Sequence, residues 1–533
     1  MVGFAELKAA DPAAFRLTAT AYEDLAGVVD AQLDPLRTNG ESLNNAWSGN
    51  DQVGGTAAVE AVRDQHDRAT IAQADLVGVA GELNTLADVV ELSQQRLNDA
   101  LDRAKSFAIV AEDGSSIRLN IEALQQRGVK PSDLKHYMTS MQTIADDISD
   151  ALTTATEADE TARTRISLLT PTLTSNPPSA DDVPEPEDHW NPEQVNEWWH
   201  GLTPEQRQSL LMNRPDLIGP LDGVPTVYRD VANRALLDEQ LNDVEAALAD
   251  DPDNKRLLGI QEGLLEIRER LESDHGSAGY DDRGYLLLID SSGDGQAVVA
   301  VGNPDVADNV VTFVPGTGAE LSTASGDVAR VDRMVADANL LDPGSTAGIM
   351  WLGYDAPDNV ALAADPSYAN DAEADLQRFQ WGMEVTQGGP DEVLNTTMGH
   401  SYGSTVVGHS AAEGDGLRTD QIVLVGSPGV GTDHASDLQI GAENVYATTA
   451  PNDLIHIVPD ASWAHGTAPI MESFGAEVFE TPRHDGSRSE AHSAYWDEGN
   501  PARDSMALII TGDGDEVQRT DYHERWYQWR PWN

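Results

Sequence analysis

The feature that most constrains the fold is the Gly-His-Ser-Tyr-Gly sequence at residues 399–403. The preceding residues, 392–398, are predicted to form a short strand, and residues 404–412 a helix. A serine in a strand–turn–helix setting is typical of a nucleophile held on a sharp turn at the end of a sheet, where the two glycines remove colliding Cβ atoms. We therefore predict that Ser401 is a catalytic nucleophile. The alternative is an exposed serine in a glycine-rich turn, because 45 glycines make chance matches common.

Length and charge narrow the class of protein. A chain of 533 residues predicts two or three domains. Lys and Arg number 33 against 91 Asp and Glu, a formal charge of −58. Such a surface repels phosphate backbones and anionic headgroups, so no nucleic-acid partner is expected. Without cysteine there is no disulfide or thiolate site. Neither a conventional signal peptide nor a transmembrane segment is apparent, which predicts a cytoplasmic protein or, alternatively, one secreted without such a signal.

Residues 1–169 are predicted to form an all-α domain of long helices, because apolar residues recur there at helical spacing. Examples are Leu76, Val79, Leu83, Leu86, Val90, Leu97 and Leu101. The Trp-Ser-Gly sequence at 47–49 resembles the turn of the WXG-type helical hairpins associated with type VII secretion. This resemblance implies a helical partner or self-association through the N-terminal domain. The alternative is a tryptophan that packs a turn in a purely structural bundle.

The rest of the chain divides into three predicted parts. Residues 170–189 are proline-rich and acidic, which is typical of an extended linker. Residues 190–278 return to helical spacing and are a possible cap over a pocket. In residues 279–533 short apolar runs alternate with helical stretches, which predicts an α/β domain with a largely parallel, doubly covered sheet. The expected strands are 285–289, 297–301, 309–314, 346–352, 392–398, 421–425 and 444–449, with helices at 326–340 and 371–387.

A nucleophilic serine needs a base and an acid, which in this arrangement follow it in the order acid, then histidine. Asp453 lies in the loop after the expected strand 444–449, although it could also simply cap a turn. His492 is the favoured base and His465 the reserve, whereas His456 is too close to Asp453 along the chain. The catalytic prediction is therefore Ser401, Asp453 and His492.

The loop after residues 309–314 is predicted to help stabilise an oxyanion. It is rich in glycine, so an N–H group of Thr317 or Gly318, together with that of Tyr402, would form the oxyanion hole. An ordinary strand-to-helix turn is the alternative. The histidines lack the paired spacing of metal ligands, and no cofactor or metal is expected.

Several separated motifs resemble, in order, a family of α/β-hydrolases of unknown function, family 1023, which is common in actinobacteria. They lie at 214–219, 221–225, 229–234, 314–318, 351–357, 399–403 and 492–496, so the resemblance covers about residues 190–497. It implies an α/β-hydrolase fold with Ser401 as nucleophile, supports Asp453 and His492, and implies no particular substrate.

The expected function is that of a serine hydrolase acting on a small-molecule acyl substrate, with a carboxylic ester as the first choice. Two alternatives remain. A thioesterase or acyltransferase would use the same triad. A non-enzymatic secretion-associated or structural interaction protein would rely on the helical N-terminal domain instead.

Overall fold

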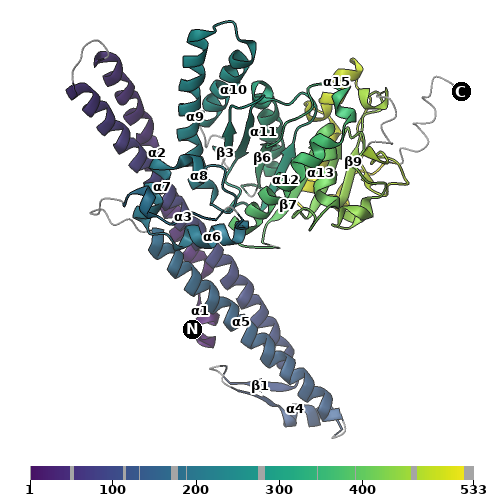
Figure 1. Cartoon of the computed structure of the whole chain (residues 1–533). Coiled ribbons are helices and arrows are strands. Elements are labelled where there is room, and N and C mark those ends of the chain that lie inside the picture. Colours follow the sequence, from purple (N-terminus) through teal and green to yellow (C-terminus); the bar gives the residue numbers. More distant parts are fainter. Residues whose placement is uncertain are drawn as a thin grey trace, which may run out of the picture. The chain divides into compact units, whose positions relative to one another are not determined.

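The computed structural model divides the chain into two compact units, Met1–Pro177 with His200–Gln208, and Pro178–Trp199 with Ser209–Asn533 (Figure 1). The residues that the structure describes are 2–47, 53–111, 114, 116–130, 133–169, 178–187, 189–273, 282–344, 346–390, 392–457 and 465–520.

Long helices dominate the first unit: α2 (Pro12–Trp47), α3 (Val53–Ala104) and α5 (Leu134–Leu169), with the short helices α1 (Phe4–Ala9) and α4 (Ile121–Gln126). Leucine, alanine and isoleucine side chains from α1, α3 and α5 share one apolar core. The predicted helical N-terminal region is thus confirmed. Within the predicted Trp-Ser-Gly turn, Trp47 is the last residue of α2, and Ser48 and Gly49 lie outside the described residues.

One element of the first unit departs from the all-α prediction. Strands β1 (Ala108–Val110) and β2 (Ile117–Leu119) form a two-stranded antiparallel sheet. Each strand has three residues, which is too short for an alternating pattern to stand out from the surrounding helical spacing.

An eight-stranded sheet forms the centre of the second unit, in the order β10-β9-β8-β7-β5-β6-β4-β3. Strands β5 to β10 pair in parallel, whereas β4 is antiparallel to both β3 and β6. The strands are β3 (Gly284–Asp290), β4 (Gln296–Val301), β5 (Asn309–Val314), β6 (Thr346–Leu352), β7 (Leu394–His400), β8 (Gln421–Val425), β9 (Val445–Thr448) and β10 (Glu477–Val478). This mostly parallel sheet confirms the predicted fold class.

Helices cover both faces of the sheet. The crossover from β5 to β6 through α11 (Ala324–Leu341) moves along the sheet in the opposite direction to the crossover from β6 to β7 through α12 (Ser367–Thr386). Because such crossovers are right-handed, α11 and α12 lie on opposite faces. Helix α13 (Tyr402–Ala412) packs beside α12, and α16 (Pro501–Ile510) beside α11. The carboxyl ends of β5, β7, β8 and β9 therefore open at one edge of a covered sheet.

Between the predicted linker and the sheet, the described residues form the helices α6 (Pro192–Gly201), α7 (Pro204–Asn213), α8 (Pro215–Ile218), α9 (Thr226–Asp250) and α10 (Lys255–Glu272). Side chains of α9 bond to the backbone of the edge strand β3. Arg229 donates to the Leu287 carbonyl, and the Leu286 N–H donates to Asp230. This contact gives α9 a structural role at the sheet edge, and a covering role over a pocket stays a prediction.

Two further observations concern the remaining sequence predictions. Within the predicted linker, the described residues 178–187 include a short 3-10 helix, Ala180–Asp182. Among the helices that the structure describes, none is long and apolar enough to cross a lipid bilayer.

Candidate active site

Ser401 occupies a strained turn between β7 and α13. Its backbone has φ 54° and ψ −127°, a left-handed conformation that is rare for a residue other than glycine. The Ser401 N–H donates to the Val425 carbonyl at 2.9 Å, which ties the turn to the end of β8. A serine held in this way projects from the carboxyl edge of the sheet, as a nucleophile does in this fold.

Glycines allow the loop after β5 to press against this turn. A Cβ on Gly403 would lie 2.1 Å from the Val314 carbonyl oxygen, and a Cβ on Gly316 would lie 2.8 Å from both the Ser401 Cβ and the Tyr402 nitrogen. Neither position can hold a side chain without moving backbone. The 314–316 backbone and the start of α13 are therefore in direct contact.

Asp453 and His492 form a buried hydrogen-bonded pair. The Asp453 side chain is fully buried, and its Oδ1 accepts from His492 Nδ1 at 2.7 Å and from the Ile455 N–H at 2.7 Å. Its Oδ2 accepts from the Tyr495 hydroxyl. Because Nδ1 donates to the carboxylate, the neutral His492 ring presents an unprotonated Nε2, which is the tautomer a general base needs.

Two contacts bring His492 beside the nucleophile turn. A Cβ on Gly426, the residue after β8, would lie 3.3 Å from His492 Cε1 and 3.2 Å from Asp453 Oδ2. His400, which directly precedes Ser401, donates from Nε2 to the His492 carbonyl at 2.7 Å, and the two imidazole rings have centroids 4.8 Å apart. No hydrogen bond joins Ser401 to His492 within the described residues.

His400 itself is held neutral. Burial, reinforced by the nearby His492 and Arg330, lowers the pKa of His400 well below its ordinary value. A neutral ring whose Nε2 donates to a carbonyl has one fixed orientation. His400 therefore supports the backbone of His492 without adding a charge beside it.

The two other downstream histidines considered from the sequence have different partners. His465 is fully buried, and its Nε2 donates to the Ala363 carbonyl at 2.8 Å. His456 bonds through Nε2 to the Ala450 carbonyl at 3.0 Å. Of the three histidines, His492 is the one hydrogen-bonded to Asp453.

The N–H groups predicted to form the oxyanion hole differ in whether they already have a hydrogen-bond acceptor. The Gly318 N–H donates to the Pro357 carbonyl at 2.9 Å. The N–H groups of Thr317 and Tyr402, in contrast, have no acceptor among the described residues. Thr317 and Tyr402 are thus the better pair to receive an oxyanion.

Sequence reasoning did not single out Tyr495. It is fully buried, its hydroxyl donates to Asp453 Oδ2, and the same hydroxyl accepts from the Ala450 N–H at 2.9 Å. Its position in the sequence could have indicated a role in the site. Tyr495 comes three residues after His492, and this spacing places both side chains on one side of a helical turn.

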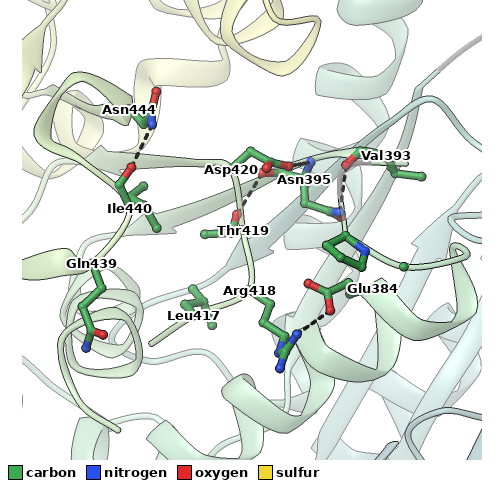
Figure 2. Close-up of a pocket in the computed structure, with 12 residues that line it drawn as sticks. Glu384, Val393, Asn395, Leu417, Arg418, Thr419, Asp420, Gln439, Ile440 and Asn444 are labelled. Carbon is green, nitrogen blue, oxygen red and sulfur yellow. Dashed lines mark hydrogen bonds and ion pairs between the residues drawn. The ribbon is translucent and has the colours of Figure 1, made fainter. Parts of the chain in front are cut away.

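A cavity of about 300 Å³ lies at the amino ends of β7, β8 and β9, the edge of the sheet opposite Ser401 (Figure 2). Its polar groups already pair with one another: Arg418 with Glu384 at 2.5 Å, and the Asn395 N–H with Asp420 at 2.7 Å. It therefore offers few unsatisfied groups to a ligand. No cluster of three or more metal-ligating side chains occurs in the part of the chain that the structure describes.

Comparison with known proteins agrees with this fold. The sequence pattern of the family described as Alpha/beta hydrolase matches residues 290–462, which include Ser401 and Asp453. The uncharacterized protein Rv2079 of Mycobacterium tuberculosis is 29% identical over 489 residues, covering 82% of this chain and 73% of its own length. The uncharacterized protein Rv0963c of the same species is 33% identical over 218 residues, covering 39% of this chain and 78% of its own. The chain belongs to the alpha/beta hydrolase family.

Solved structures are also similar to this chain. A thermostable esterase from Pseudomonas putida has 16% identity and a TM-score of 0.28, covering 47% of this chain and 88% of the esterase. The Francisella virulence factor BioJ has 12% identity and a TM-score of 0.26, covering 51% of this chain and 99% of that one.

Proposed function

We propose that this alpha/beta hydrolase is a serine hydrolase that cleaves a carboxylic ester or a related acyl bond. Ser401 is the nucleophile, His492 the general base and Asp453 the residue that orients the base. The observation that carries the proposal is the 2.7 Å hydrogen bond between His492 and the fully buried Asp453, beside a serine whose φ is 54°.

The reaction follows from these roles. His492 Nε2 takes the Ser401 proton as Oγ attacks the carbonyl carbon, and the Thr317 and Tyr402 N–H groups stabilise the negative oxygen. His492 then returns the proton to the departing alcohol, and a water molecule, activated in the same way, hydrolyses the acyl-enzyme. The hydrogen bond between Ser401 and His492 forms on substrate binding, as such contacts commonly tighten only in the complex.

Charge favours an ester over the thioester of a polyanionic carrier. With a formal charge of −58, the protein repels a substrate that bears several phosphates, whereas a neutral ester approaches without this cost. Thioesterase and acyltransferase reactions would use the same residues. Product analysis with an ester, a thioester and a competing alcohol separates the three.

A fluorophosphonate probe tests the nucleophile. We expect the wild type to be labelled and Ser401→Ala to lose the label, while Ser493→Ala, which removes an exposed hydroxyl next to His492, keeps it. Equal labelling of the wild type and Ser401→Ala would refute the assignment. No labelling of either would favour a non-enzymatic role for the chain.

A further inference from the structure

Residues 357–365, which follow β6 and are called the rim segment here, are fixed at both ends to the proposed site. At one end the Pro357 carbonyl accepts from the Gly318 N–H at 2.9 Å, next to the proposed oxyanion donor Thr317. At the other end the Asp365 carbonyl accepts from the Tyr402 hydroxyl at 2.5 Å. The rim segment therefore runs from the loop that contains Thr317 to the side chain of Tyr402, the residue after Ser401.

Internal bonds order the rim segment between these two ends. The Asn359 side chain accepts from the N–H groups of Ala361 and Leu362, at 3.0 and 3.2 Å. The Ala363 carbonyl accepts from His465 at 2.8 Å, and the His465 ring packs edge-on against Tyr402. A segment with this many fixed points presents its outward side chains in defined positions.

The middle of the rim segment is apolar yet exposed. Val360 is 47% exposed and Leu362 39% exposed, with alanines beside them. A single exposed leucine needs no explanation in a folded protein. Two exposed apolar side chains are different when their segment is bonded to the loop after β5 and to the residue that follows Ser401, because a substrate bound at Ser401 would then lie near that segment. Carboxylates at Asp358 and Asp365 flank this apolar stretch and disfavour an anionic ligand.

We propose that Val360 and Leu362 are specificity-determining residues that contact the aliphatic acyl chain of an uncharged ester. The inference rests on the proposed function and adds the substrate class to it. Contact with the chain removes apolar surface from water in the bound state, so a longer acyl chain raises kcat/KM. The carboxylate released by hydrolysis is repelled by the acidic surroundings, which favours product release.

Hydrolysis of p-nitrophenyl acetate and p-nitrophenyl octanoate by the full-length protein tests this. The wild type is expected to prefer the octanoate by about tenfold in kcat/KM, a typical effect of apolar contacts on selectivity. Val360→Ser combined with Leu362→Ser should remove most of that preference and leave the acetate rate within about twofold. The control is Leu340→Ser: Leu340 is 80% exposed but lies before β6 rather than after it, and the change should alter neither rate.

The outcomes separate the two proposals. A wild type that hydrolyses acetate through Ser401 but shows no preference for octanoate overturns the rim assignment alone, as does a double variant with the wild-type ratio. A wild type that hydrolyses neither ester and is not labelled by the fluorophosphonate probe overturns the hydrolase proposal, and the rim assignment with it. Unchanged thermal unfolding of the double variant rules out a folding defect as the cause of a lost preference.

Discussion

At the scale of single residues, the Asp453 carboxylate shows how burial and hydrogen bonding combine. Three donors converge on this fully buried group: the Ile455 N–H and His492 on one oxygen, and the Tyr495 hydroxyl on the other. A buried carboxylate without partners would be strongly unfavourable, so each donor both stabilises the fold and fixes the plane of the group. Tyr495 thereby sets the direction from which Asp453 meets His492.

Replacing Tyr495 tests this positioning. Tyr495→Phe leaves Asp453 Oδ2 and the Ala450 N–H without that partner, so we expect the free energy of unfolding to fall by about 1–3 kcal/mol. We also expect a fall in kcat of about tenfold with little change in KM, together with a shifted pH–rate profile, because the basicity of the imidazole depends on the carboxylate.

Steady-state kinetics across pH and urea unfolding measure both effects. Tyr368→Phe is the matched control, because the Tyr368 hydroxyl has no hydrogen-bond partner among the described residues. If Tyr495→Phe lost stability with an unaltered pH profile, its role would be structural only.

From the sequence we could propose the residues of the candidate site but not the contacts between them. Ser401, Asp453 and His492 follow from motif, chain order and loop position, all of which are local properties. The Gly318 N–H, in contrast, is occupied by the carbonyl of Pro357. Pro357 lies 39 positions further along the chain, and reasoning from neighbouring residues cannot connect the two. The same limit applies to the Tyr495–Asp453 contact, which two separated segments create.

At the scale of elements, side chains of α9 occupy carbonyl groups of β3 with which a further strand would otherwise pair. Side chains of Arg229, Asn233 and Arg234 donate to the carbonyls of Leu287, Leu286 and Gly284, respectively, on the outer edge of β3. Burial raises the pKa of Asp222, and the Arg229 guanidinium at 2.9 Å opposes that rise. The helix is thus attached to the sheet by buried charge as well as by packing.

Removing the buried guanidinium should be costly. Arg229→Leu leaves the buried Asp222 with only the more distant Arg378, at 3.7 Å, and removes donors from the Leu287 and Gly219 carbonyls. We therefore expect a loss of about 3 kcal/mol in the free energy of unfolding. Arg256→Leu, which removes an exposed arginine of α10, should change it by less than about 1 kcal/mol. Urea unfolding measures both variants, and equal effects would contradict a special role for Arg229.

Element prediction succeeded where apolar runs were continuous. The runs at 309–314, 346–352 and 421–425 match β5, β6 and β8, because strands covered on both faces are apolar throughout. The strand before Ser401 extends to His400, two residues beyond its prediction. Gly399 and His400 have the composition of a turn, but they still pair with Leu424 and Val425 of β8. The two-residue β10 carries too little pattern to be recognised.

At the scale of the whole molecule, charge is the dominant property. A formal charge of −58 implies strong self-repulsion in the folded state, which dissolved salt screens. We expect the melting temperature to rise between 0.05 and 1 M NaCl, by about 1 °C for each kcal/mol of repulsion relieved in a chain of this length. Differential scanning calorimetry measures the shift. Choline chloride at the same ionic strength should reproduce it, and a rise confined to NaCl would point to specific cation binding instead.

The attachment of α9 to β3 affects whether edge strands of two molecules can pair with each other. A sheet margin with unpaired N–H and carbonyl groups recruits strands from other molecules and so seeds aggregates. Here arginine and asparagine side chains already occupy carbonyls at one margin, and at the other the short β10 is followed by a bridge between Phe479 and Arg519. Strand exchange between molecules is therefore hindered at both margins of the described sheet, which helps such a large α/β core to remain dispersed at high concentration.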